Sequence, residues 1–143
     1  QGKPTAWLHR SAAPTIVSTF APDPKHEAPF ELGMGVVNVP FQIPNMRMEN
    51  PPAAAHTRIG WFRSVSNVPH AFAVQSFVAE LAAAAGRDHR DYLLDLIGPA
   101  RRIDPGALQD SWNHDESPQR YPFDTGRLRR VIEIAFGQSF SVS

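Results

Sequence analysis

Residues 67–86, NVPHAFAVQSFVAELAAAAG, carry the clearest structural signal in the chain. Apolar side chains recur there at helical spacing, at Val74, Phe77, Val78, Leu81 and Ala85. Asn67 is placed to act as the N-cap, Pro69 suits the first turn, where its missing N–H costs nothing, and Gly86 can end the helix. The stretch therefore predicts a long helix with one buried face.

Two shorter helices are expected after this one. Asp88 can cap the first of them and Gly98 can end it. Its apolar positions are Leu93, Leu94, Leu96 and Ile97. Asp124 can cap the last helix, which has an apolar face made of Leu128, Val131, Ile132 and Ala135. Residues 99–122 lie between these two helices and are expected to form a long loop.

The first half of the chain carries short β-branched or alternating apolar stretches that are separated by proline-bearing loops. The candidate strands are residues 15–20 (TIVSTF), 34–41 (MGVVNVPF), 45–49 (NMRME) and 58–63 (RIGWFR). Strands followed by helices, in two blocks, indicate an α+β fold. We expect a single domain over residues 1–143, with short, mainly antiparallel strands packed against two or three helices.

Composition argues against several classes of function. The 143 residues include 14 basic and 14 acidic side chains, so net charge gives no reason to expect a nucleic-acid partner. There is no cysteine, which excludes disulfides, thiolate nucleophiles and cysteine-based zinc sites. The longest apolar run, residues 71–85, is too short for membrane insertion. The six histidines never pair at i, i+4 around a carboxylate, so no metal site is predicted.

The loop before the long helix, residues 60–66 (GWFRSVS), has the features of an anion-binding site. Arg63 is a forked, permanently charged donor, and Ser64 and Ser66 are small enough for backbone N–H groups to approach a ligand. The N-terminus of the helix would add positive potential, which suits a phosphate or a metal-oxo group. An Arg before a helix is also common without any ligand, so a purely structural loop is the alternative.

His70 is a further candidate, because it lies in the first helical turn and is expected to face the same loop. No catalytic residue is predicted. Ser64 lacks a G-x-S-x-G setting and an obvious His–Asp pair, so a nucleophilic role for it is not supported.

Four motifs in combination point to one protein family. They are the IPN turn at 43–45, GWFRSV at 60–65, SFVAELAAAAGRD at 76–88 and RYPFDTGRLRRVIEIA at 120–135. Together they resemble the beta subunit of isoquinoline 1-oxidoreductase, among the large molybdenum-binding subunits of the xanthine dehydrogenase and aldehyde oxidase family. The resemblance covers about residues 7–135 and corresponds to one internal stretch of a much larger subunit.

The resemblance implies an enzyme that hydroxylates an N-heterocycle or an aldehyde at a molybdenum held by molybdopterin, usually molybdopterin cytosine dinucleotide in bacterial members. Electrons would leave through an iron–sulfur subunit. It maps a cofactor contact to Arg63, with Ser64 and Ser66 beside it, and a substrate contact to Val65. His70 stands where isoquinoline-type subunits often have Asn, next to the implied substrate pocket.

The family's glycine-rich cofactor loop and the segment with its catalytic glutamate have no counterpart in this sequence. We therefore expect a fragment or split chain of a large subunit, which supplies one wall of the molybdopterin site and alone holds no cofactor and does not turn over. The alternative is a stand-alone, non-enzymatic binding or self-association module. Surfaces that face the remaining large-subunit domains in the complete enzyme would be exposed, which predicts a homo-oligomer.

Overall fold

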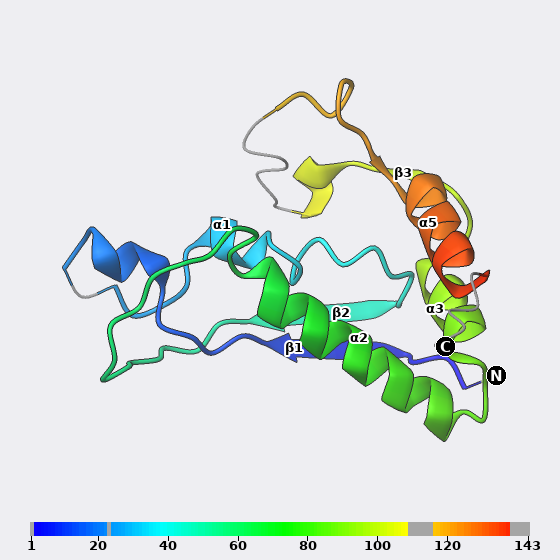
Figure 1. Ribbon diagram of the computed structural model, residues 1–143, viewed down its shortest axis with the longest axis horizontal. Helices are drawn as coiled ribbons and strands as arrows, with labels where there is room; N and C mark the ends of the chain where they lie inside the picture. The colour runs from blue at the N-terminus through cyan, green and yellow to red at the C-terminus, as the bar shows by residue number, and fades with distance from the viewer. Residues whose placement is uncertain (1, 23, 109–115, 138–143) are drawn as a thin grey trace, which may run out of the picture.

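The computed structural model describes residues 2–22, 24–108 and 116–137, and places a long helix along a small sheet (Figure 1). The helix is α2 (Asn67–Ala84), and the sheet consists of β1 (Ala6–Arg10) and β2 (Asn45–Glu49). Helix α3 (His89–Ile97) packs against α2, and α5 (Thr125–Gly137) packs against α3. The expected α+β class, with strands mostly in the first half and helices in the second, is confirmed.

The short elements connect these parts. A 3₁₀ turn, η1 (Ile16–Thr19), and a one-turn helix, α1 (Pro29–Leu32), lie between β1 and β2. The predicted loop 99–122 contains β3 (Arg102–Ile103) and the 3₁₀ turn η2 (Pro105–Leu108), and its residues 109–115 lie outside the described part. Strand β4 (Phe123–Asp124) pairs with β3 in an antiparallel ladder.

The sheet in the first half is parallel, not antiparallel as expected. Trp7 of β1 lies opposite Met46 of β2, and His9 lies opposite Met48. Parallel strands require a long crossover connection, and residues 11–44 provide one. Two of the predicted strands, residues 15–20 and 34–41, are part of this crossover instead of the sheet.

Of the four predicted strands, only residues 45–49 are confirmed, as β2 with the same bounds. Residues 16–19 form η1, because the Thr15 hydroxyl accepts a hydrogen bond from the Val17 N–H (3.1 Å) and folds the backbone back. Residues 34–41 form turns followed by irregular chain, and residues 58–63 form an irregular loop that ends in a turn. The apolar alternation at Val39, Phe41 and Ile43 arises because these side chains are buried in the core. It does not indicate a strand.

Helix α2 confirms the predicted helix in residues 67–86, but its N-cap differs and Phe77, predicted on the buried face, is 46% exposed. Its N-cap is Ser66, already in a helical conformation and without a side-chain cap hydrogen bond, so the assignment of Asn67 as N-cap is wrong. The preceding residues form turns that lead directly into the helix, which leaves no extended residue from which a side chain can fold back. Gly86 ends the helix with φ +62°, and the Arg87 N–H donates to Ala82 O (2.9 Å) in a Schellman motif.

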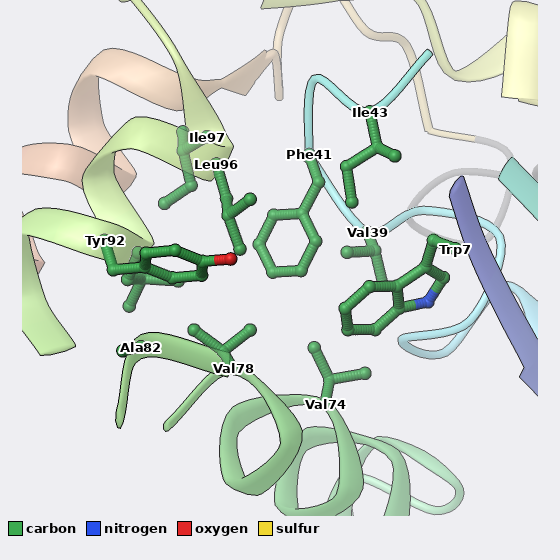
Figure 2. Packing of buried hydrophobic residues seen from close by; sticks show 11 residues of the cluster. Trp7, Val39, Phe41, Ile43, Val74, Val78, Ala82, Tyr92, Leu96 and Ile97 are labelled. Atoms are coloured by element: carbon green, nitrogen blue, oxygen red, sulfur yellow. The ribbon is translucent and has the colours of Figure 1, made fainter. Parts of the chain in front are cut away.

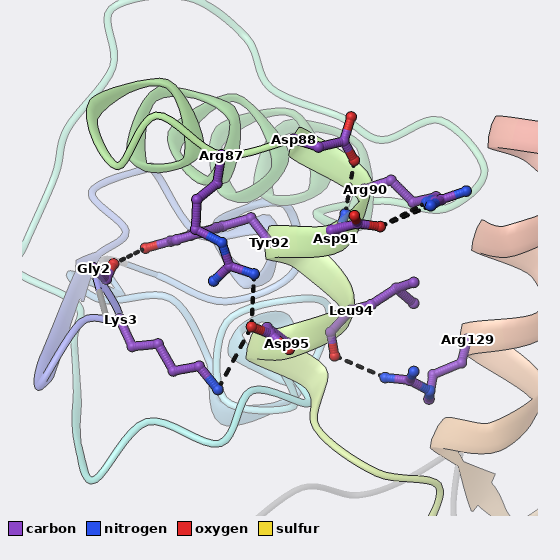
Figure 3. Close-up of polar contacts among 10 residues, drawn as sticks. All are labelled: Gly2, Lys3, Arg87, Asp88, Arg90, Asp91, Tyr92, Leu94, Asp95 and Arg129. Atoms are coloured by element: carbon purple, nitrogen blue, oxygen red, sulfur yellow. Dashed lines mark hydrogen bonds and ion pairs between the residues drawn. The ribbon is translucent and has the colours of Figure 1, made fainter.

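The core lies between α2, α3 and the segment 39–43 (Figure 2). Its buried members are Trp7, Val39, Phe41, Ile43, Val74, Val78, Ala82, Tyr92, Leu93, Leu96 and Ile97. The rings of Trp7 and Phe41 meet edge to face with centroids 5.5 Å apart. The Tyr92 hydroxyl donates to the Gly2 carbonyl (2.8 Å), which satisfies a polar group that would otherwise be buried without a partner (Figure 3).

Both ends of α3 are capped by side chains. Asp88 accepts a hydrogen bond from the Asp91 N–H (3.0 Å) at the N-terminus, as predicted. At the C-terminus, Arg129 of α5 donates to the carbonyl of Leu94 (2.8 Å), which also accepts from the Gly98 N–H (Figure 3). Arg129 also donates to the carbonyl of Gly98 (2.7 Å), just past the last helical residue. Arg129 thus fixes α5 on α3 through backbone groups.

No single described helix is long and apolar enough to cross a membrane; α2 and α3 meet that test only as a pair, bent by 113°.

Replacing Arg129 with Met should lower the free energy of unfolding by about 1–3 kcal/mol, because the partly buried carbonyls of α3 lose a charged donor. Arg130→Met is the matched control. Arg130 is exposed on the same helix, and among the described residues its only recorded contact is a long ion pair with Glu133 (3.8 Å). Its loss should therefore change stability by less than about 0.5 kcal/mol. Urea denaturation measures both. Equal effects of the two substitutions would contradict this account of α3 capping.

Candidate functional site

The loop in front of α2 lines a cleft with a volume of about 600 Å³, a size common for small-molecule sites. Three parts of the chain form its walls. They are residues within 13–16, the region of α1 with Glu27 and Glu31, and residues within 59–69. All four loop residues predicted from the sequence, Arg63 to Ser66, line this cleft. The structure thus places these candidates at a concave surface, which the sequence did not show.

The backbone of this loop is strained at its centre. Ser64 and Val65 have φ values of 66° and 44°, in the left-handed region that side chains rarely adopt. The conformation is held by two turn hydrogen bonds, from the Val65 N–H to Phe62 O (3.2 Å) and from the Asn67 N–H to Ser64 O (2.8 Å). Such strain costs about 1–3 kcal/mol per residue and clusters at ligand-binding sites, most clearly at a β-branched residue such as Val65.

Arg63 and two loop amides are free to bind a ligand. The Arg63 side chain is exposed and forms no hydrogen bond or ion pair with any described residue. The N–H groups of Ser64 and Ser66 likewise have no partner in the described chain, whereas those of Val65 and Asn67 are used in the turns. The loop therefore offers a ligand one guanidinium and two free backbone N–H groups. A helix N-terminus with all its first N–H groups unbonded would offer more.

His70 does not belong to this cleft. Its ring is buried, with Nδ1 2.9 Å from the Met34 carbonyl and Nε2 2.9 Å from the Ser11 hydroxyl. A carbonyl can only accept, so Nδ1 carries the proton, and in the neutral ring Nε2 accepts from Ser11. The expectation that His70 faces the loop is not matched by this geometry, because the first turn of α2 directs the ring toward β1 and residue 34.

His9 of β1 lies against His70, with ring centroids 5.8 Å apart. Its Nδ1 is buried and has no hydrogen-bond partner among the described residues. Burial, and then the neighbouring His70, lower the pKa of His9 below its usual value. The folded chain therefore favours the neutral form of His9. A metal role for these histidines is not supported, since the described residues hold no group of three or more potential ligands.

The lowered pKa of His9 predicts acid sensitivity. The unfolded chain takes up the His9 proton near its usual pKa of about 6.5, while the folded chain resists it, so the free energy of unfolding should fall as pH drops below about 6.5 and level off below the folded-state pKa. His9→Gln should flatten this decline, and His56→Gln, at an exposed histidine, should leave it unchanged. Urea denaturation from pH 7.5 to 5 tests this; identical slopes for wild type and His9→Gln would refute it.

Two buried glutamates that sequence reasoning missed also line the cleft. Glu31 is 1% exposed, and its carboxylate accepts hydrogen bonds from the Thr15 hydroxyl, the Ala28 N–H (2.7 Å) and the Ile16 N–H (2.9 Å). It thereby ties η1 to α1 and builds one wall. Glu27 is 5% exposed, and its Oε2 is buried without a partner in the described chain.

A sequence signal existed for only one of these glutamates. Glu31 is the third residue of a helix that begins with proline, where a glutamate commonly folds back onto the N-cap N–H. Nothing in the pattern marks Glu27, because glutamate is seldom buried and its burial here depends on segments distant in sequence.

Comparison with known proteins gives one partial similarity. The chain is 35% identical over 96 residues to a nicotinate dehydrogenase subunit of Pseudomonas putida. The match covers 66% of this chain and 8% of that protein, so the chain corresponds to a small part of its relative. No family model and no solved structure matches the chain. The similarity supports a relation to a dehydrogenase subunit and does not single out the isoquinoline 1-oxidoreductase type.

Proposed function

We propose that this chain is part of the large subunit of a molybdenum hydroxylase, where it forms one wall of the molybdopterin site and is inactive by itself. The similarity to a nicotinate dehydrogenase subunit supports the enzyme class, as do the four sequence motifs. The observation that carries the proposal is the strained Ser64–Val65 turn beside an unpaired Arg63 in a cleft. The motif comparison selects the same residues as cofactor and substrate contacts.

The residues present fit the anionic part of such a cofactor. Arg63 has all its guanidinium donors available, and the free N–H groups of Ser64 and Ser66 can add hydrogen bonds to an oxygen-rich group. The redox chemistry of hydroxylation would come from the cofactor. The contribution of this chain is to bind and orient it, with Val65 beside the position of an N-heterocyclic or aldehyde substrate.

His70 has a positioning role in this proposal. Its hydrogen bonds to Ser11 and Met34 fix the first turn of α2 against β1 and against the chain before Val36, and so set the position of the loop that α2 follows. The cofactor in the complete enzyme would be molybdopterin, as the cytosine dinucleotide in a bacterial host. The partners would be an iron–sulfur subunit and the other domains of the large subunit.

Metal and pterin analysis tests the proposal on the chain purified from its native host with bound partners retained. We expect molybdenum and a pterin in the complex, and at least about a tenfold loss of both in Arg63→Ala, because a charged donor to an anionic group is removed. Arg58→Ala, at an exposed residue shortly before the cleft loop, should retain both. A stable wild-type complex that contains no molybdenum would refute the proposal.

A self-association module is the second candidate function, and several exposed aromatic side chains favour it. Phe20, Phe62 and Phe72 are 76%, 88% and 75% exposed, and Trp61 lies against Phe20 with ring centroids 5.5 Å apart. Large exposed apolar side chains of this kind mark surfaces that other protein covers. In the complete enzyme the neighbouring domains would cover them, and in the isolated chain a second copy would do so.

The isolated chain should therefore form a homo-oligomer, and the double substitution Phe62→Ser with Phe72→Ser should shift it toward the monomer, because apolar contact area is lost. Sedimentation velocity over a range of concentrations measures the effect. Ala83→Ser with Ala84→Ser introduces two hydroxyls at exposed positions near the C-terminal end of α2 and serves as the control. A wild-type chain that sediments as a monomer at the highest concentration would exclude this surface as a self-association site.

A further inference from the structure

Glu27 is a buried carboxylate that nothing in the described chain satisfies. Its Oε2 has no hydrogen-bond partner, although the side chain is only 5% exposed. Glu31 is just as deeply buried, but both of its oxygens accept hydrogen bonds. Burial of an unpaired carboxylate opposes folding, so a residue of this kind calls for a partner that the chain itself does not supply.

The position of Glu27 indicates where such a partner would lie. Glu27 and Arg63 line the same cleft of about 600 Å³, and no ion pair joins them. The rest of the lining is mostly apolar, with aromatic rings from Trp61 and Phe62 and aliphatic groups from Pro14, Ile16, Ile59 and Val68. The cleft is thus lined by a glutamate with one buried, unpaired oxygen and by an unpaired cation, within apolar walls.

No contact among the described residues explains why the Glu27 carboxylate is buried without a partner. A metal ion would need further ligands, and no group of three histidine, aspartate or glutamate side chains is present there. The donors around Glu31, from Thr15, Ile16 and Ala28, are all used by the Glu31 carboxylate and none is recorded at Glu27. An N–H donor that enters the cleft from outside satisfies the carboxylate without breaking any of these contacts.

We propose that the cleft binds a small amphoteric molecule, with a planar N–H cation of the amidinium type on Glu27 and an anionic group on Arg63. Amidinium N–H groups form charge-assisted hydrogen bonds to a carboxylate, and the guanidinium of Arg63 matches a carboxylate in the same way. A flat aromatic body between the two groups suits the rings of Trp61 and Phe62. The proposal shares Arg63 with the proposed cofactor contact and differs from it in the use of Glu27, which has no part in that contact.

Isothermal titration calorimetry of the 143-residue chain with 4-amidinobenzoate tests this assignment, with benzamidine and benzoate as probes of each half. We expect 4-amidinobenzoate to bind most tightly. Glu27→Gln should weaken 4-amidinobenzoate and benzamidine at least about tenfold and leave benzoate unchanged, because only the amidinium loses its charged partner. Arg63→Gln should weaken 4-amidinobenzoate and benzoate and leave benzamidine unchanged. Absence of binding at millimolar probe, or equal affinity in Glu27→Gln, would overturn the proposal.

Thermal unfolding without any probe gives a second, independent test. If Glu27 is retained for a ligand, Glu27→Gln should unfold at the same or a higher temperature than wild type, since an uncompensated buried charge is removed. Glu80→Gln, at an exposed glutamate of α2, should have no effect. A lower unfolding temperature for Glu27→Gln would show that the carboxylate supports the fold and would overturn its assignment to a ligand. Neither result changes the molybdenum content expected to depend on Arg63, so the two proposals can fail separately.

Discussion

One face of α2 packs against the core, and the other elements take their positions from this contact. Val74, Val78 and Ala82 of this helix are buried against Trp7 and Phe41 and against the residues of α3 (Figure 2). Burial of apolar area at this seam supplies the main driving force, because the β1–β2 ladder is only five residues long and has no third strand in the described chain. Once α2 is fixed, the loop that precedes it has little freedom.

The cleft in front of α2 contains backbone and side-chain features that are unusual in a folded protein. Val65 adopts a left-handed conformation, Arg63 is left without a partner among the described residues, and Glu27 buries an unpaired oxygen. The strained backbone at Val65 and the unpaired oxygen of Glu27 oppose stability, and both occur with Arg63 at one concave surface. Core elements such as α3 show the opposite behaviour, with both helix ends capped by side chains. This contrast is expected of a protein in which a binding surface is supported by a rigid scaffold.

The similarity to a nicotinate dehydrogenase subunit extends over 96 residues of this chain. The chain corresponds to 8% of that protein, so a whole active site would have to be built with other segments. An exposed aromatic surface next to the cleft, formed around Trp61 and Phe62, is consistent with a position between domains. In the proposed function the chain would supply one wall of a site that other parts of the subunit complete.

Local patterns in the sequence specify the helices, since apolar spacing, Asp88, Gly86 and Asp124 act within one or two turns of chain. They also locate the Arg63 loop, whose small residues and charge are visible without a fold. Contacts formed only in the folded chain set the parallel pairing of β1 with β2, the inward turn of the His70 ring and the burial of Glu27. Each of these depends on segments tens of residues apart, and the free energy of such contacts overrides the preference of any single stretch.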